Sequence, residues 1–276
     1  VVTVTNPPLN VWVAYLAHWL RGHRYVAIVW DIYPDVLNRL GYCGEQSRVS
    51  RAWKAINSIA YHHASFIVTL GQQMSETLKR QIRIEDHSRV HVLPTAVDTT
   101  ALIPVAKEEN SFARWHGQNA FLTVLYSGNM GATHSLDCVT EAARRLCENA
   151  NISFLLVGDG FRRAQLERTV QRLGLTNVTL LNRQPEEVLG LLLASGDIGL
   201  VSLDRGVEGI SMPSKTYALM AVGCALIGIC EPESDLARTI RECSCGVSVP
   251  PGDPDALANA ILLMASDPAL LQGIRQ

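Results

Sequence analysis

The sequence predicts an α/β protein in which helices cover parallel sheets in two domains. Three observations indicate this fold class. Short apolar runs alternate with amphipathic segments along most of the chain, as strands and helices do around a parallel sheet. A stretch with prolines and polar residues interrupts the alternation between Pro94 and Asn119. The two sides of this break differ in charge, with +3 for residues 1–100 and −5 for the remainder.

Length and composition are sufficient for two domains of moderate size. The 276 residues are 47% apolar and carry a net charge of −2, so each domain has enough apolar material for a core. We predict a first domain over 1–100, a linker over 101–118 and a second domain over 119–276. No apolar run approaches the length of a transmembrane helix.

The second domain is predicted to have strands and helices in strict alternation. The expected strands are 122–126, 152–157, 178–181, 198–201, 225–229 and 247–249, and the expected helices are 136–147, 161–173, 186–194, 214–222, 234–242 and 255–265. Ser135 is a plausible N-cap, and Gly174 ends the helix that precedes it. Ligands of such sheets bind beyond the carboxyl ends of the strands, which is where we look for a site.

The first domain is predicted to be only part of an α/β unit. Its expected strands are 1–5, 25–30, 65–70 and 90–93, and its expected helices are 11–20, 47–62 and 72–81. The first of these strands begins at Val1, with no earlier unit to supply its neighbours. We therefore expect an incomplete domain that lacks an N-terminal portion.

The most informative stretch begins at Glu208 and ends in the strand 225–229. It reads as a polar loop, a short helix, a glycine stop and a buried strand. Ser214, Lys215 and Tyr217 lie at the start of the helix, where backbone N–H groups favour anions. A lysine in this place predicts a phosphate-binding residue, although a solvated lysine on an exposed helix turn is the alternative.

A second anion-suited loop is Tyr126-Ser-Gly-Asn-Met-Gly131, between a strand and a helix. Backbone N–H groups from Gly128 to Gly131 can donate to an anion. These glycines are equally consistent with a tight turn that has no ligand. Two such loops in one domain predict a nucleotide-diphosphate ligand.

The cysteines indicate a cytoplasmic protein. There are seven, an odd number, and none of their spacings is that of a usual zinc site. We expect reduced thiols and no metal. The pair His62-His63 ends a predicted helix, where it suits the helix dipole better than a metal. We also expect no nucleic-acid partner for this weakly acidic chain.

The chain resembles the family 4 (group 1) nucleotide-sugar glycosyltransferases, especially those of bacterial surface-polysaccharide biosynthesis. The resemblance covers nearly the whole chain and rests on Asp31-Ile-Tyr-Pro-Asp35, Leu93-Pro-Thr-Ala-Val-Asp98, Tyr126-Ser-Gly-Asn-Met-Gly131, Val157-Gly-Asp-Gly160 and Glu208-Gly followed by Pro213-Ser-Lys-Thr-Tyr217. It implies the GT-B fold of two facing Rossmann-like domains. It also implies a nucleotide-sugar donor on the C-terminal domain, an acceptor on the N-terminal one, and retention of configuration without an obligatory metal or other cofactor.

The chain departs from this family at the diphosphate. Many relatives carry an arginine and a lysine around the first donor-domain loop, and the matching positions here are Asn129 and His134. Lys215 is then the best remaining cation, assisted by backbone N–H groups of Gly128–Gly131. His134 suits either a place near the phosphate or solvent.

A second departure concerns the carboxylates. Many relatives have two glutamates with seven residues between them, one at the transferred sugar and one at the ribose. Glu208 takes the first role if this loop is two residues longer, or it is a surface acid. Ala218 occupies the second position, so Tyr217 is the neighbour that we expect at the ribose. Pro213 and Ser214 complete the donor-binding segment that the resemblance implies.

Asp31 is the candidate on the acceptor side. It follows the buried strand 25–30, where its carboxylate can bind acceptor or cap the next turn. With Glu208 and Lys215 it completes the predicted catalytic set.

The helix 47–62 raises the question of a membrane. Val49, Trp53 and Ile56 lie on one side of it with Ala52 and Ala60, and Arg48, Arg51 and Lys54 lie beside them. This pattern suits peripheral attachment to anionic lipid, while an ordinary core helix with a basic solvent face is the alternative. A lipid-linked acceptor, which the resemblance suggests, favours a protein at the inner face of the cell membrane.

We therefore predict a retaining glycosyltransferase that moves a sugar from a nucleotide-diphosphate sugar to a glycan or lipid-linked glycan. A GT-B nucleotide-sugar epimerase and a non-catalytic sugar-nucleotide-binding subunit are the alternatives. Because acceptor loops are expected in a missing N-terminal portion, we expect residues 1–276 alone to have poor or no transferase activity.

Overall fold

The computed structural model describes residues 1–82, 86–131 and 136–275. They form two compact units, each of which is described by itself. The first unit comprises Val1–Thr95 and Gly206–Met212, and the second comprises Ala96–Arg205 and Pro213–Gln276. The predicted α/β fold with two parallel sheets is confirmed.

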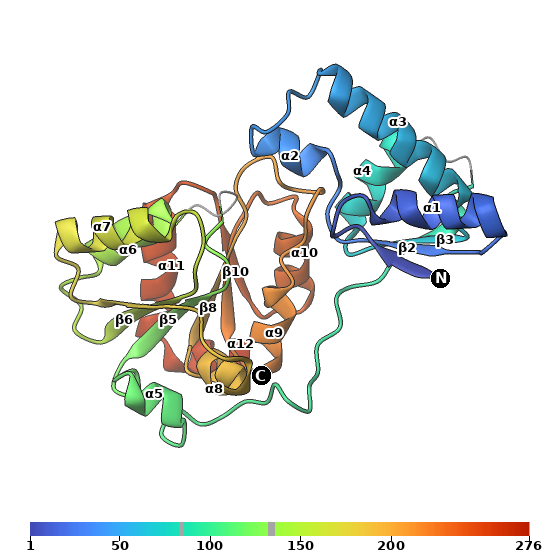
Figure 1. The fold of residues 1–276 in the computed structure, drawn as a ribbon. Coiled ribbons are helices and arrows are strands. Elements are labelled where there is room, and N and C mark those ends of the chain that lie inside the picture. Colours follow the sequence, from blue (N-terminus) through green and yellow to red (C-terminus); the bar gives the residue numbers. More distant parts are fainter. Residues whose placement is uncertain (83–85, 132–135, 276) are drawn as a thin grey trace. The chain divides into compact units, whose positions relative to one another are not determined.

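The first unit is built on a four-stranded parallel sheet. Its strands are β1 (Val2–Val4), β2 (Val26–Val29), β3 (Phe66–Thr69) and β4 (Val90–Val92), and they lie side by side in chain order. Its helices are α1 (Asn10–Arg21), α2 (Asp35–Arg39), α3 (Arg48–His63) and α4 (Gln72–Ile82), with a short 3₁₀ turn η1 (His87–Arg89). Right-handed crossovers between strands in this order place the connecting helices on one face. In Figure 1, α1, α3 and α4 lie on one side of these strands.

The second unit is built on a six-stranded parallel sheet. Its strands are β5 (Leu122–Ser127), β6 (Ile152–Val157), β7 (Val178–Leu181), β8 (Ile198–Ser202), β9 (Ala225–Ile229) and β10 (Gly246–Val249). The order across the sheet is β10-β9-β8-β5-β6-β7. The direction of winding therefore reverses between β5 and β8. In a doubly wound sheet, this reversal opens a crevice at the carboxyl ends of the two strands.

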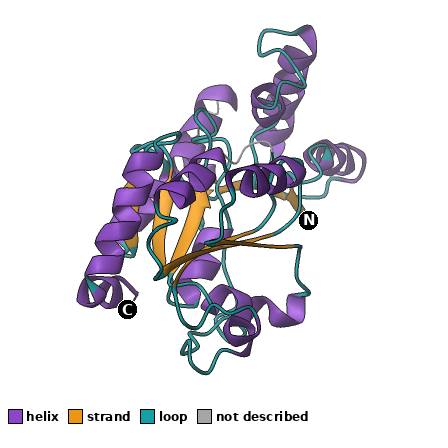
Figure 2. Ribbon diagram, turned by 90° about the vertical axis from the view of Figure 1, so that its left-hand side faces the viewer, coloured by secondary structure: helices purple, strands orange, loops and turns teal. Residues whose placement is uncertain are grey.

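Helices pack against both faces of this second sheet. They are α5 (Ser111–Trp115), α6 (Asp137–Arg145), α7 (Arg163–Leu173), α8 (Leu189–Ala194) after the 3₁₀ turn η2 (Glu186–Val188), α9 (Lys215–Ala221), α10 (Asp235–Glu242), α11 (Pro254–Ser266) and α12 (Pro268–Arg275). One large apolar core joins the strands to α6, α7 and α11, while α8, α9 and α10 continue the winding beyond β7. Figure 2 shows helices flanking the strands.

The predicted strands are all present, with boundaries within two residues of those expected. Helices α2, α5 and α12 were not predicted. Helix α5 lies within the predicted linker 101–118, where Asn110 caps it by accepting from the Ala113 backbone N–H at 3.0 Å, and Phe112 is buried. Tertiary packing supports this five-residue helix, which is too short to form by itself. The predicted N-cap Ser135 lies outside the described residues.

Among the described residues, no single helix is long and apolar enough to cross a membrane. Only α11 and α12 taken together have sufficient length and apolar composition, and they meet at an angle of 99°.

A buried ionic cluster holds the amino-terminal edge of the second sheet. Asp197, just before β8, accepts from the Thr123 backbone N–H at 2.8 Å and from Arg275 Nη1 at 2.9 Å. Its second partner side chain is Lys107, whose ammonium also contacts Thr123 Oγ1 at 2.9 Å. One carboxylate therefore ties the 96–110 segment, the central strands and α12 together. It lies at the end of the sheet opposite the crevice.

We predict that Asp197→Ala destabilises the protein by about 3–5 kcal/mol, because it leaves buried cations and a backbone N–H without their acceptor. Urea unfolding checks this value. Asp255→Ala is the matched control: its carboxylate pairs with Arg145 but is 76% exposed, so its loss is expected to cost about 1 kcal/mol or less. Equal losses for the two variants would contradict the role of Asp197.

Candidate active site

Two loops at the carboxyl edge of the second sheet fit together through glycines. Gly128 follows β5, and Gly158 and Gly160 follow β6. All three have positive φ, near +145°, a conformation that other residues rarely adopt. A Cβ on Gly158 would lie 1.9 Å from the Gly128 carbonyl oxygen, and one on Gly160 would lie 2.5 Å from Asn129 Oδ1. The loops can therefore pack this closely only because these positions lack side chains.

Backbone hydrogen bonds fix the same two loops. The Gly128 N–H donates to the Val157 carbonyl at 3.0 Å, and the Met130 N–H donates to the Asp159 carbonyl at 2.8 Å. The Tyr126 hydroxyl donates to the Asn129 carbonyl at 2.8 Å. Gly128 therefore does form a tight turn, as one of the two interpretations expects. The same residue also lines a cavity.

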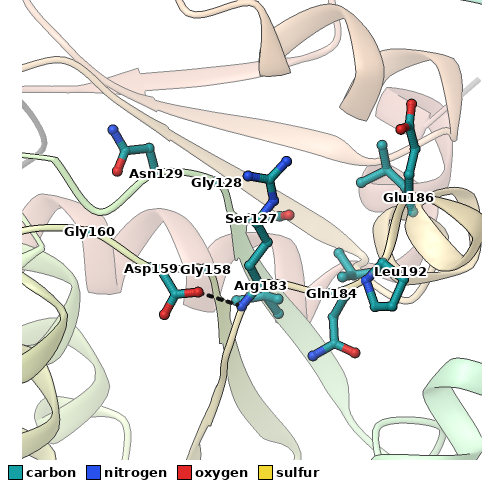
Figure 3. A pocket seen from close by; sticks show the side chains of 13 residues that line it. Ser127, Gly128, Asn129, Gly158, Asp159, Gly160, Arg183, Gln184, Glu186 and Leu192 are labelled. Carbon is teal, nitrogen blue, oxygen red and sulfur yellow. Dashed lines mark hydrogen bonds between the residues drawn. The ribbon is translucent and has the colours of Figure 1, made fainter.

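The cavity has a volume of about 690 Å³ and lies at the carboxyl ends of β5, β6 and β7. Ser127, Gly128, Asn129, Val157 and the segment Gly158–Gly160 line one side, and Arg183, Gln184, Pro185, Glu186, Leu189 and Leu192 line the other. Figure 3 shows the Arg183 side chain extending across it, while the Arg183 backbone N–H donates to Asp159 Oδ2 at 3.1 Å. Apolar side chains of Val157, Pro185, Leu189 and Leu192 stand among polar and charged ones, a mixed lining that suits a flat ring with hydroxyl or amide groups.

Lys215 lies next to these loops and follows β8, the neighbour of β5 at the reversal of the sheet. It is the first residue of α9, and its Nζ lies 4.0 Å from the centre of the Tyr126 ring. Nζ also lies against the backbone of Gly128, since a Cβ placed there would be 3.3 Å away. The structure therefore brings Lys215 next to Gly128, whose loop the sequence analysis pairs with it at the diphosphate.

The Lys215 ammonium has no hydrogen-bond acceptor among the described residues. Part of the side chain is exposed, but Nζ itself is buried. Burial lowers the pKa of this group from 10.5 to about 7. The Tyr126 ring gives only partial compensation through a cation–π contact. A buried cation without an acceptor, next to a backbone turn and a cavity, is suited to receive an anionic ligand.

The remaining residues of the 213–217 segment have structural contacts. Helix α9 has seven residues, and Ser214 makes no side-chain cap for it, so Lys215 itself and not the helix start is the anion-suited feature. Tyr217 shares a hydrogen bond with Thr239 of α10. Residues two apart on a helix point to different sides, so Tyr217 is not brought together with Lys215. Pro213 is buried, and its carbonyl accepts from Thr216 Oγ1 at 2.7 Å.

Glu208 and Asp31 both belong to the first unit. The segment Gly206–Met212 groups with that unit, although the sequence places it within the predicted domain 119–276. Asp31 and Ser211 form an isolated antiparallel bridge, and the Ile32 N–H donates to the Ile210 carbonyl at 2.8 Å. The structure therefore joins the loop that carries Glu208 to the loop that carries Asp31.

The two carboxylates lie in partly desolvated places. Burial raises the pKa of Asp31, and a hydrogen bond from the Ser211 side chain opposes this effect. Glu208 Oε1 is buried and has no hydrogen-bond partner among the described residues. Glu208 Oε1 is therefore available to accept a hydrogen bond from a ligand hydroxyl.

Other predicted and unpredicted positions complete the account of the site. His134 lies outside the described residues, and Gly131 is the last residue described before that gap. Arg183, Gln184 and Glu186 were not predicted. Their only signal in the sequence is position: they follow β7, and residues at the carboxyl edge of a doubly wound sheet are candidates for ligand contact.

Comparison with known proteins finds relatives that are all described as glycosyltransferases. Residues 122–267 match the profile of glycosyl transferases group 1. The chain is 27% identical over 264 residues to a probable glycosyltransferase, WbjE, of Pseudomonas aeruginosa, covering 95% of this chain and 64% of that protein. It is 28% identical over 249 residues to WcaI of Escherichia coli, a putative colanic acid biosynthesis glycosyl transferase, covering 88% and 60% respectively. The chain thus spans less than two thirds of the length of these relatives.

Solved structures share the fold at low sequence identity. HepE of Anabaena, crystallised with UDP, superposes with a TM-score of 0.79 at 16% identity, over 96% of this chain and 69% of that one. The lipopolysaccharide-biosynthesis glycosyltransferase WaaG superposes with a TM-score of 0.73 at 15% identity, over 98% and 76%. These likenesses support the two-domain GT-B fold.

We predict that Lys215→Met makes the protein more stable at neutral and lower pH. Between pH of about 7 and 10.5, the unfolded chain holds the Lys215 proton more tightly than the folded protein does. The burial penalty is therefore complete below about pH 7, and wild-type stability rises with pH up to about 10.5. The variant removes this penalty and should gain roughly 2–4 kcal/mol at low pH.

Urea unfolding across this pH range measures the effect. Lys79→Met, on the partly exposed side of α4, is the control and should change stability by about 0.5 kcal/mol or less. A Lys215→Met variant that is less stable than wild type at every pH would show that the ammonium has a partner, contrary to the structure.

Proposed function

Because the chain belongs to the group 1 glycosyl transferases, we propose that it transfers a sugar from a nucleotide-diphosphate sugar to a glycan or lipid-linked glycan, with retention of configuration. The observation that carries this proposal is the buried, unpartnered Lys215 Nζ against Gly128, at the edge of the cavity. A diphosphate is the part of the donor that such a cation would bind.

The donor is proposed to extend from Lys215 into the cavity. Its diphosphate would lie at Gly128 and Lys215, where the ammonium gains the acceptor that it lacks. The nucleoside would lie between Val157 and the loop Gln184–Glu186, with Arg183 across it and Asn129 at the rim. HepE, whose fold is similar, has been crystallised with UDP and with UDP-glucose.

The proposed chemistry uses Lys215 as the cation at the leaving group. As the glycosidic bond breaks, negative charge grows on the diphosphate, and a positioned ammonium stabilises that charge most in the transition state. Binding of the anionic donor would raise the pKa of Lys215 again, so Lys215 would take up a proton when the donor binds. We propose no metal or other cofactor for this step.

Glu208 and Asp31 are proposed to act on the sugar and the acceptor. The unpartnered Glu208 Oε1 would accept from a hydroxyl of the transferred sugar. Asp31, whose pKa is raised by burial, would bind the acceptor hydroxyl that attacks. The bridge between Asp31 and Ser211 supports a joint role, because it holds these loops together within one unit.

The proposed acceptor places the reaction at the inner face of the cell membrane. A lipid-linked glycan presents its reactive hydroxyl close to a bilayer surface, so an enzyme that uses it works there. WcaI is described as a colanic acid biosynthesis enzyme, which supports a polysaccharide acceptor for this chain.

Calorimetric titration with UDP-sugars and GDP-sugars tests the donor site. We predict that one nucleotide binds, and that its affinity falls about tenfold per pH unit above pH 7, as Lys215 must take up a proton to bind it. Lys215→Met should weaken binding at least ~10-fold and abolish the pH dependence, while Lys79→Met should change neither. Binding of neither nucleotide would contradict the site.

Product analysis with the nucleotide that binds then tests the reaction in the full-length protein. A new glycoside supports the transferase. An epimerised sugar without transfer would support the epimerase instead, and binding without any turnover would support a non-catalytic subunit.

A further inference from the structure

The loop that carries Glu208 folds into a turn whose far end is fixed to the first unit. The Ile210 N–H donates to the Val207 carbonyl at 3.2 Å, so Glu208 lies at the tip of the turn. Both of these apolar side chains are buried. Beyond the turn, the bridge between Ser211 and Asp31 joins the loop to the end of β2. The part of the loop that follows Glu208 is therefore held by backbone contacts.

Helix α2 holds the start of the same loop. Its last residue, Arg39, donates from Nε to the Gly206 carbonyl at 2.8 Å. Gly206 has a φ of +79°, and a Cβ at this position would overlap the Arg39 guanidinium. The guanidinium can therefore reach the backbone two residues before Glu208 only because Gly206 has no side chain.

Helix α4 packs against the tip of the turn. Gly209, directly after Glu208, has a φ of +67°. A Cβ on Gly209 would lie 2.9 Å from Thr77 Oγ1 and 3.0 Å from Gln73 Cγ, and both of these residues belong to α4. Two helices and the Asp31 bridge thus hold one short loop, and all of them belong to the first unit.

The position of the Glu208 carboxylate depends on these backbone contacts. Glu208 Oε1 is buried and has no hydrogen-bond partner among the described residues, so no protein group fixes this atom directly. Among the contacts that hold the loop, the Arg39 hydrogen bond has a charged donor, and such bonds are stronger than neutral ones. In the described part of the chain, the Arg39 side chain makes no other hydrogen bond or ion pair. Its whole interaction is therefore with the loop.

We propose that Arg39 is a positioning residue for sugar transfer, which holds the loop so that Glu208 Oε1 meets a hydroxyl of the transferred sugar. The proposal rests on the function proposed for Glu208 above. A displacement of about 1 Å at a reacting centre costs up to about 100-fold in rate, so a contact that fixes the loop affects turnover without touching the substrate. Arg39 acts on the rate through the backbone of Gly206.

Amide hydrogen exchange of the full-length protein tests the hold on the loop without any substrate. The Ile210 and Ser211 N–H groups, which donate within the turn, are the probes. In Arg39→Ala we expect them to exchange about tenfold faster, because one charged hydrogen bond no longer opposes local opening. Arg24→Ala is the matched control: Arg24 is an exposed arginine of the same unit, and its side chain makes no hydrogen bond or ion pair among the described residues. It should leave the exchange unchanged.

Kinetics with the nucleotide sugar that binds then test the role in transfer. Arg39→Ala should lower kcat about tenfold and leave the Kd of the corresponding nucleoside diphosphate unchanged, because that ligand has no sugar for Glu208 to meet. Arg39→Lys should recover most of the loss, since a single donor suffices for one carbonyl. In a Glu208→Gln background, Arg39→Ala should cost little more, because the group that it positions is already lost.

Three results would overturn the proposal. They are unchanged exchange in Arg39→Ala, a loss of kcat that adds fully to that of Glu208→Gln, and a parallel fall of kcat, nucleotide affinity and Tm, which would show a role in the fold alone. If neither UDP nor GDP binds, the proposed function fails and the role in transfer fails with it. The exchange measurement would then still decide whether Arg39 holds the loop, so the two failures are distinguishable.

Discussion

The ammonium of Lys215 is the constraint on which the site depends. It is buried between the Tyr126 ring and the Gly128 backbone without an acceptor among the described residues. This arrangement follows from strand order, because β5 and β8 are neighbours at the reversal of the sheet and α9 follows β8. It is unfavourable for the folded protein alone and becomes favourable when a ligand brings negative charge. Stability is therefore given up at the place where we propose that the donor binds.

The two ends of the second sheet divide stability from function. At the amino-terminal edge, the Asp197 carboxylate accepts hydrogen bonds from Lys107, Arg275 and the Thr123 backbone N–H. At the carboxyl-terminal edge, Lys215 Nζ has no such partner among the described residues, and three glycines let the two loops pack closely beside a cavity. The buried charge at the amino-terminal edge has its hydrogen-bond partners, whereas the buried ammonium at the carboxyl-terminal edge has none among the described residues. The carboxyl-terminal edge is where a doubly wound sheet takes its ligands.

The sequence predicts the strands well, because buried parallel strands are continuous apolar runs with few alternatives. It also predicts that Gly128 and Lys215 bind the diphosphate, because each lies between a strand and a helix. Arg183 could not be singled out, because an arginine in a loop is usually solvated and only the cavity gives it a role. Tyr217 was placed at the ribose from its neighbours in sequence, whereas helix geometry turns it toward Thr239.

The most direct test of the account is the pKa of Lys215, measured by NMR of the full-length protein with labelled lysine side chains. In the free protein we predict a pKa of about 7, and on addition of the nucleotide-diphosphate sugar a rise toward the ordinary value of 10.5. A free-protein pKa that is already near 10.5 and does not respond to the donor would contradict both the burial of this ammonium and its role at the diphosphate.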